Sequence, residues 1–284
     1  MNEPEIRTVT LPVIHVTANT LPEGWERAVV RTWEAGASIS TEYDKADDPM
    51  SRDGIAVVTI TDPMAEPRIH RAFPGGIVEL EAYRQEVVDG IHDHWVDPSA
   101  GKWEYTYHER LAAYSVPGLE KPVNQLDYVI DALSAAPHTR RAQAIMWKPW
   151  EDAGISDPAC LQRFWFRVFD DELVLNVHMR SNDAFKAAFM NMYAFTDLQR
   201  VVAERISEKL GRKIRVGQYT HIADSFHIYG SYFSEFEGFL KTLQTRSFEE
   251  RTFRTEDVQE IIDEARVQIA ASLASEAASG RKGL

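Results

Sequence analysis

Residues 161–181, LQRFWFRVFDDELVLNVHMRS, decide the fold class of this chain. Two apolar runs rich in aromatic and β-branched residues flank Asp170-Asp171, which is typical of two strands joined by a turn. Another strand-like run, RRAQAIMWKP, precedes them at 140–149, and IRVGQYTHIADSFHIYG follows at 214–230. Several consecutive strands of this kind predict an antiparallel or mixed sheet.

Helical patterns alternate with these strands. Residues 185–211 are apolar nearly all round and stop at Gly211, which predicts a long helix buried in the centre of a domain. Further helices are expected at 21–36, 75–91, 123–137 and about 255–279, and a strand at 54–62. We therefore predict an α+β fold, with a mixed, largely antiparallel sheet packed with helices. It forms a single domain over residues 1–284, with a variable N-terminal part and a polar C-terminal helix and flexible tail from about 255 to 284.

Composition excludes several classes of protein. The 284 residues carry a net charge of -13, which argues against a protein that coats nucleic acid or an anionic membrane. The single cysteine allows neither an intramolecular disulfide nor a zinc site built from several thiolates, and we expect no metal. The N-terminal residues have neither a signal-peptide pattern nor a membrane span, so a soluble, cytoplasmic protein is the expectation.

The single cysteine, Cys160, lies directly before the strand at 161–169, at a loop-to-strand edge where side chains are often presented to a cleft. Arg140 and Arg141 precede it, and Arg180-Ser181 follow. Arginine offers a fork of donors suited to phosphate oxygens, and cations nearby stabilise a thiolate. Taken singly, each arginine is more typical of a surface ion pair, and the cysteine of a small buried apolar residue.

Taken together, these residues resemble the thymidylate synthase and pyrimidine nucleotide hydroxymethylase family, clearly over 137–229 and more weakly over 25–114. The shared motifs are the arginine pair of PHTRR (137–141), the loop MWKPWEDAGISDPAC (146–160) and an Arg-Ser-x-Asp motif at 180–183. An asparagine on the following helix, Asn191, and a His-x-Tyr pair, His227 and Tyr229, complete the set. Five motifs in one order are far more specific than any one of them.

The resemblance implies one-carbon transfer to C5 of a pyrimidine nucleoside monophosphate, dUMP or dCMP. In such a reaction Cys160 attacks C6 of the ring, and 5,10-methylenetetrahydrofolate supplies the carbon. Arg52, placed in an SRDG turn, would hold the 5′-phosphate with Arg180 and Ser181. The other implied substrate-binding residues are Asp183, Asn191, His227 and Tyr229, together with Arg140 and Arg141 from a neighbouring subunit. The chain is therefore expected to be a homodimer with shared sites.

Two further catalytic residues are implied by the resemblance. Glu79, in the segment IVEL, resembles a catalytic glutamate that organises water and relays protons, whereas Glu81 is expected to be a solvated helix residue. Tyr107 resembles the tyrosine that helps to remove the C5 proton. Tyr105 is a close rival for that role.

The chain also departs from the family pattern. Leu161 stands where a histidine usually follows the nucleophile, and AAFMN (187–191) replaces a Gly-x-Pro-Phe-Asn run. A charged helix and RKGL stand where the family has a short apolar tail that closes over the folate and excludes water. These departures favour hydroxymethylation slightly, and the alternative is thymidylate synthesis proper, the reductive methylation of dUMP.

Asn191 bears on the choice of base. An asparagine can present a donor and an acceptor to O4 and N3–H of uracil, which favours a uracil nucleotide over a cytosine nucleotide. Two other classes of protein stay open on the residues alone. One is a cysteine hydrolase using Cys160 with His178 or His227, and the other is a nucleotide-binding protein without catalysis.

Overall fold

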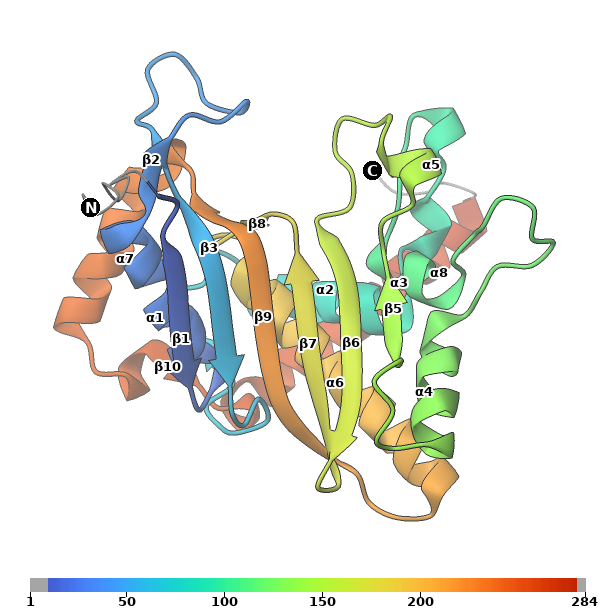
Figure 1. The fold of residues 1–284 in the computed structure, drawn as a ribbon. Coiled ribbons are helices and arrows are strands. Elements are labelled where there is room, and N and C mark those ends of the chain that lie inside the picture. The colour runs from blue at the N-terminus through green and yellow to red at the C-terminus, as the bar shows by residue number, and fades with distance from the viewer. Residues whose placement is uncertain (1–9, 280–284) are drawn as a thin grey trace, which may run out of the picture.

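The computed structural model describes residues 10–279. Its main sheet has the strand order β1-β3-β9-β7-β6-β5, with β2 paired to β3 and β8 to β9 (Figure 1). The pairs β1–β3, β7–β9 and β8–β9 are parallel, and β2–β3, β3–β9, β6–β7 and β5–β6 are antiparallel. The sheet is therefore mixed and packed with helices, which confirms the predicted α+β fold class.

The strands are Val13–Ala18 (β1), Ala37–Ile39 (β2), Ser51–Ile60 (β3), Ile69–His70 (β4), Gln143–Ile145 (β5), Leu161–Phe169 (β6), Glu172–Met179 (β7), Asn182–Asp183 (β8), Arg215–Ile228 (β9) and Thr252–Phe253 (β10). The helices are Leu21–Ala35 (α1), Ile77–Asp89 (α2), Tyr107–Ala112 (α3), Gln125–Ala135 (α4), Pro149–Asp152 (α5), Ala188–Leu210 (α6), Phe233–Thr245 (α7) and Gln259–Ser279 (α8). Strands β4 and β10 form a separate two-stranded sheet.

The hairpin predicted from residues 161–181 is confirmed. Strands β6 and β7 pair in antiparallel fashion from Leu161 opposite Met179 to Phe169 opposite Glu172. The two residues between them, Asp170 and Asp171, have positive φ angles of 55° and 59°. Two successive residues of this kind form the turn whose twist matches that of the flanking strands, and aspartate tolerates the conformation better than most residues.

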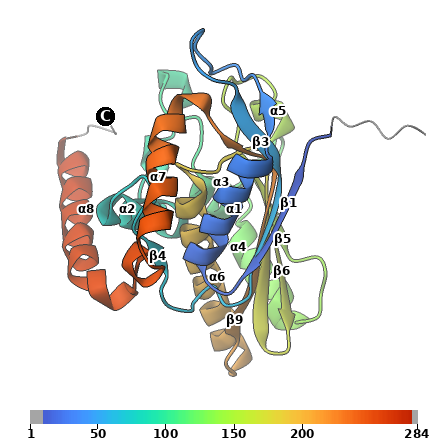
Figure 2. The ribbon, with the colours of Figure 1, turned by 90° about the vertical axis from the view of Figure 1, so that its left-hand side faces the viewer.

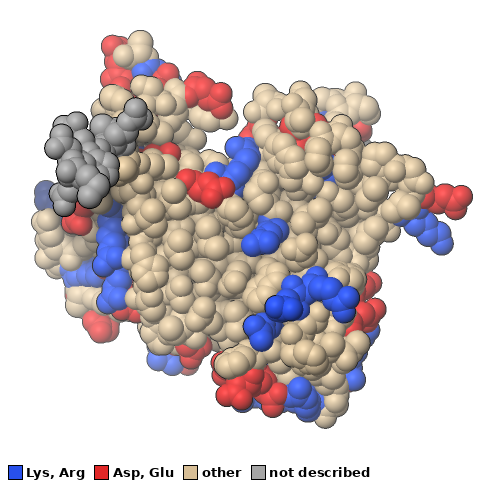
Figure 3. All heavy atoms as spheres, viewed as in Figure 1, with Lys and Arg blue, Asp and Glu red and all other residues tan. Residues whose placement is uncertain are grey.

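The longer helices lie on one side of the sheet (Figure 2). Helices α1 and α6 pack next to the strands, α2 packs on α6, and α8 packs on α2 as the outermost layer. The opposite face of the sheet, which faces the viewer in Figure 1, is crossed by none of these helices. Figure 3 shows this open face as mostly neutral surface with sparse charged side chains.

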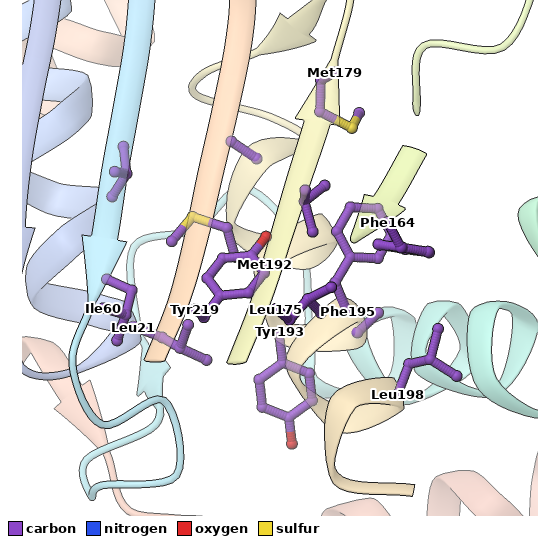
Figure 4. Packing of buried hydrophobic residues seen from close by; sticks show 14 of the residues in the cluster. Leu21, Ile60, Phe164, Leu175, Met179, Met192, Tyr193, Phe195, Leu198 and Tyr219 are labelled. Atoms are coloured by element: carbon purple, nitrogen blue, oxygen red, sulfur yellow. The ribbon is translucent and has the colours of Figure 1, made fainter. Parts of the chain in front are cut away.

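The core lies between the sheet and α6. Leu175 of β7 lies near Met192 and Phe195 of α6, whereas Met179 lies farther along the strand, where it lines the cavity described below (Figure 4). The helix is buried for most of its length, as its apolar sequence predicts, and it ends at Gly211, whose φ is 62°. Burial of this apolar surface, at about 25 cal/mol per Å², fixes α6 and the cavity at its N-terminal end.

Two structural expectations need correction. Arg52 was placed in a turn, but Ser51 already begins β3, and Arg52 pairs with Ser38 of β2 and Ile228 of β9. The strand expected over 140–149 is limited to β5, because Pro149 starts the short helix α5. The polar tail RKGL lies outside the described residues. Within 10–279, no helix is long and apolar enough to cross a bilayer.

Candidate active site

A cavity of about 330 Å³ lies at the end of the sheet where β6 begins and β7 and β9 end. The N-terminal turns of α6, together with α2 and α3, complete its wall. Its lining consists of Tyr83, Tyr107, Cys160, Met179, Ser181, Asn182, Asp183, Lys186, Ala187, Met190, Asn191, His227 and Tyr229. The structure thus gathers, from five distant parts of the chain, most of the side chains that the sequence motifs singled out.

Cys160 is half-buried in this wall, directly before β6. The Arg180 backbone N–H donates to its carbonyl (2.8 Å), and the Arg180 guanidinium donates to the carbonyls of Ala159 (3.2 Å) and Pro158. Arg180 therefore holds the segment that carries the thiol. Burial raises the pKa of Cys160, whereas the nearby Arg180 lowers it by a smaller amount, as expected for a cation beside a thiol.

The arginines expected at the phosphate lie outside the cavity lining. The guanidinium of Arg52 donates to Ser38 Oγ (2.8 Å), and that of Arg180 points at the 158–159 backbone. Arg140 and Arg141 have exposed side chains beside β5. Both arginines therefore lie outside the cavity of their own chain.

Tyr105 and Tyr107 were both candidates for the tyrosine that helps to remove the C5 proton, and they differ in which cavity they line. Tyr107 lines the wall beside Cys160, and its hydroxyl accepts the Leu161 N–H at 3.3 Å. Tyr105 lines a neighbouring cavity of about 390 Å³ instead. Tyr105 also forms a hydrogen bond with the Cys160 backbone, so what separates the two tyrosines is that Tyr107 lines the cavity of the thiol and Tyr105 does not.

Glu79 is not brought to the cavity. It is exposed in the first turn of α2, where its carboxylate accepts the Gly76 N–H at 3.0 Å and caps the helix. Glu81, expected to be solvated, is only 2% exposed and is paired with Arg84 and Arg266. The expectation for Glu81 is therefore wrong, because α2 turns this side towards α8.

A hydrogen-bonded chain leads to His227. The Ser225 hydroxyl donates to Asp53 Oδ2 (2.9 Å) and lies 3.1 Å from His227 Nδ1. Burial lowers the pKa of His227 and raises that of the neighbouring Asp183, so the imidazole is neutral near pH 7. With Nδ1–H directed to Ser225, Nε2 is a bare acceptor, and this buried atom has no partner among the described residues.

Sequence reasoning missed two polar side chains of the wall. Tyr83 of α2 donates its hydroxyl to Asn191 Oδ1. Lys186 forms an ion pair with Glu235 (2.9 Å) and lies over the Tyr232 ring at 4.0 Å. The helical period offered a signal for Tyr83, since it follows Glu79 by four residues and so shares its face of α2.

The second cavity shares Tyr83 and Tyr107 with the first and extends to Trp103 and Glu86. The two hollows are thus adjacent, and a pair of ligands could meet at the shared phenols. Among residues 10–279, no group of three or more His, Cys, Asp or Glu side chains is placed to hold a metal ion.

A thiol, phenol hydroxyls and several neutral hydrogen-bonding groups around one cavity suit covalent chemistry on a small polar molecule. The model of the thymidylate synthase family matches residues 78–269, more than half of the chain. The chain belongs to the thymidylate synthase family. Members of this family transfer a one-carbon unit to a pyrimidine nucleotide and use methylenetetrahydrofolate.

Individual thymidylate synthases resemble the chain over most of its length. A relative from Methanocaldococcus jannaschii, provisionally named a thymidylate synthase, is 31% identical over 199 residues, covering 68% of this chain and 81% of its own. The thymidylate synthase of Haloferax volcanii is 30% identical over 171 residues, which cover 54% of this chain and 47% of its own. The structure of thermostable thymidylate synthase A from Bacillus subtilis shares the fold, with a TM-score of 0.58, 17% identity and coverage of 77% and 83%.

Proposed function

We propose that this enzyme transfers a one-carbon unit from 5,10-methylenetetrahydrofolate to C5 of a pyrimidine nucleoside 5′-monophosphate through a covalent Cys160–C6 adduct. The observation that carries the proposal is the position of Cys160. It is the only cysteine of the chain, and it lines one cavity with the Asn191, His227 and Tyr229 side chains. Of the two histidines that a cysteine hydrolase could use as its base, His178 is bonded to Asp224 at 3.0 Å and does not line the cavity.

The chemistry assigns each group a task. Addition of the Cys160 sulfur to C6 gives C5 carbanion character, and C5 then bonds the incoming carbon. Tyr107, beside the thiol, is suited to assist loss of the C5 proton through water. That loss breaks the bond between the new carbon and the folate nitrogen and leaves an exocyclic methylene on the ring. Water or hydride then adds to the methylene carbon, the Cys160 thiolate leaves C6, and the ring regains its double bond. Glu79 keeps its proposed proton-relay role only if the first turn of α2 releases its carboxylate from the Gly76 N–H.

The nucleotide's polar groups match the wall. Asn191 would face the base, and the bare Nε2 of His227 with the Tyr229 hydroxyl would take the sugar 3′-hydroxyl. Ser181 lines the same cavity, while Asp183 bonds the backbone N–H groups of Phe185 (3.0 Å) and Lys186 (2.8 Å) and so shapes the start of α6. The negatively charged phosphate would be bound by arginines that lie outside this wall, namely Arg52, Arg180 and the Arg140-Arg141 pair.

Hydroxymethylation is the outcome that we favour, with methylation of dUMP as the alternative. The apolar side chain of Leu161 cannot hydrogen-bond a water molecule beside the nucleophile, and its backbone N–H donates to the Tyr107 hydroxyl. Helix α8 lies outermost on α2, and none of its described residues lines either cavity. Water that reaches the intermediate adds to the exocyclic carbon, whereas exclusion of water favours reduction by hydride from the folate.

Incubation with methylenetetrahydrofolate and each of dUMP, dCMP, UMP and CMP is expected to give a hydroxymethylated deoxynucleotide. The nucleotide product is identified by mass, and the folate product by its absorbance. Hydroxymethylation leaves tetrahydrofolate, whereas methylation oxidises it to dihydrofolate. A methylated product with equal dihydrofolate would establish the alternative, and absence of any C5 product would contradict the proposed function.

Ser225→Ala is expected to raise the KM for the nucleotide about tenfold, because it removes the hydroxyl that orients the neutral His227 ring. The effect acts through the sugar's 3′-hydroxyl. The control is to measure KM for a nucleotide that lacks the 3′-hydroxyl. For this nucleotide, the KM values of the wild type and Ser225→Ala should differ little. An equal loss with both nucleotides would assign Ser225 a purely structural role.

We also propose a homodimer that forms through the open face of the sheet. Apolar side chains remain exposed there, among them Val13 and Phe169, at 64% and 66%. Exposed apolar patches of this kind mark interaction surfaces. An isologous contact through this face would bring the Arg140-Arg141 edge of one subunit to its partner.

A further inference from the structure

Two amide side chains line the cavity, those of Asn182 and Asn191, and the oxygen of each forms a hydrogen bond within the protein. Tyr83 donates its hydroxyl to Asn191 Oδ1, and within residues 10–279 this is the one hydrogen bond of the Asn191 side chain. Asn182 Oδ1 lies 2.8 Å from His221 Nε2, whose ring is bonded through Nδ1 to the Tyr219 hydroxyl at 2.8 Å. All of these partners except Tyr83 are over nine-tenths buried.

The direction of each bond follows from its donors. Burial raises the pKa of Tyr83 well above its usual value, so its hydroxyl stays protonated and can donate. Burial lowers the pKa of His221 to about 3, so this ring is neutral and carries a single N–H. The buried Tyr219 hydroxyl has no other acceptor among the described residues, so it donates to Nδ1; the ring N–H is then on Nε2 and donates to Asn182. Both amides therefore direct their NH₂ groups away from these partners.

Reversing the Asn191 amide would be costly. The Tyr83 O–H would lose the acceptor that it has in the structure, and an unsatisfied buried donor costs about 1–3 kcal/mol. The Asn182 amide is fixed in the same sense, because His221 Nε2 lies 2.8 Å from its oxygen and the NH₂ group is directed away from that ring. The amide edges of the cavity thus offer donors and select against a ligand that presents an amino group to Asn191.

We propose that Tyr83 is a positioning residue that fixes the orientation of the Asn191 amide and makes the enzyme selective for uracil over cytosine nucleotides. The O4 carbonyl of uracil accepts from the Asn191 NH₂ group. The N4 amino group of cytosine would face that NH₂ group as donor against donor. This inference rests on the proposed function, since it takes the pyrimidine ring to lie against Asn191.

The test compares kcat/KM for dUMP and dCMP in the wild type and in Tyr83→Phe. The wild type should prefer dUMP, and the preference should fall about tenfold in Tyr83→Phe, where the amide is free to turn over. Tyr193→Phe is the matched control: Tyr193 is a buried tyrosine of α6 that does not line the cavity, and its loss should leave the preference unchanged. In an Asn191→Ala background, Tyr83→Phe should no longer alter the ratio, because no amide remains to be oriented.

Binding separates this inference from the proposed function. Affinities of the wild type for dUMP, dCMP and a deoxynucleotide with only hydrogen at C4 should fall in the order dUMP, C4-unsubstituted, dCMP. This series needs neither turnover nor a folded variant. If no nucleotide is converted but the order holds, the proposed function fails and the amide orientation stands. An unchanged preference in folded Tyr83→Phe, or a wild type that prefers dCMP, would overturn the inference.

Discussion

Replacement of Cys160 by alanine is expected to abolish turnover while the enzyme still binds its nucleotide. The chain has no second cysteine, so no other thiol can form the bond to C6. Removal of a catalytic nucleophile typically lowers kcat by at least roughly a thousandfold. The polar groups that recognise the ligand, among them Asn191 and His227, belong to other elements of the wall and stay in place. Binding should therefore change far less than kcat.

Turnover is measured with the preferred nucleotide and methylenetetrahydrofolate, and affinity by calorimetry with the nucleotide alone. Cys160→Ser serves as the matched variant, because it keeps the size of the side chain and replaces the thiol by a weaker nucleophile. It too should bind and fail to turn over. Near-normal turnover by Cys160→Ala would exclude covalent catalysis through this residue.

The fold was predictable where the signal is local. The β6–β7 hairpin follows from two apolar runs around Asp170-Asp171, and α6 from its apolar length and terminal Gly211. Strand β1 gave a weaker signal, since it pairs in parallel with β3 some forty residues later, and such a pairing depends on the crossover helix α1 between them. Helix α7 was not anticipated either, although its apolar side packs on α1.

Site residues were predictable where they belong to sequence motifs whose spacing is short. Residues 180–191 lie in one short stretch, so the spacing from Ser181 to Asn191 carries over to the structure. Side chains that act by positioning a second residue do not belong to a recognisable sequence motif. Tyr83 and Ser225 matter because of what they touch across the sheet and helix layers, and only the folded chain shows those contacts. The raised pKa of Cys160 was unpredictable for a similar reason, since it depends on burial.

Mixing two inactive variants, Arg141→Ala and Cys160→Ala, is expected to restore activity if subunits share their sites. Arg141 is exposed beside β5, outside the cavity of its own chain, and its backbone carbonyl accepts the Tyr128 hydroxyl at 3.2 Å. An arginine held at a sheet edge in this way can reach a neighbouring subunit's phosphate, where its forked donors suit the oxygen atoms. The single variants then lack, respectively, the phosphate contact and the nucleophile in every site.

A hybrid dimer separates the two defects. One of its sites carries both substitutions, and the other carries neither. Random exchange at equal concentrations makes half of the dimers hybrid, so roughly a quarter of the wild-type number of sites should become intact. Activity is assayed after exchange has been verified by mass spectrometry of differently tagged chains. Arg205→Ala is the control, because Arg205 pairs with Asp127 outside the lining of both cavities, and this variant should be active without mixing. Verified exchange without recovery would place Arg141 outside the catalytic site of either subunit, and the open face of the sheet would then need another explanation for its exposed apolar side chains.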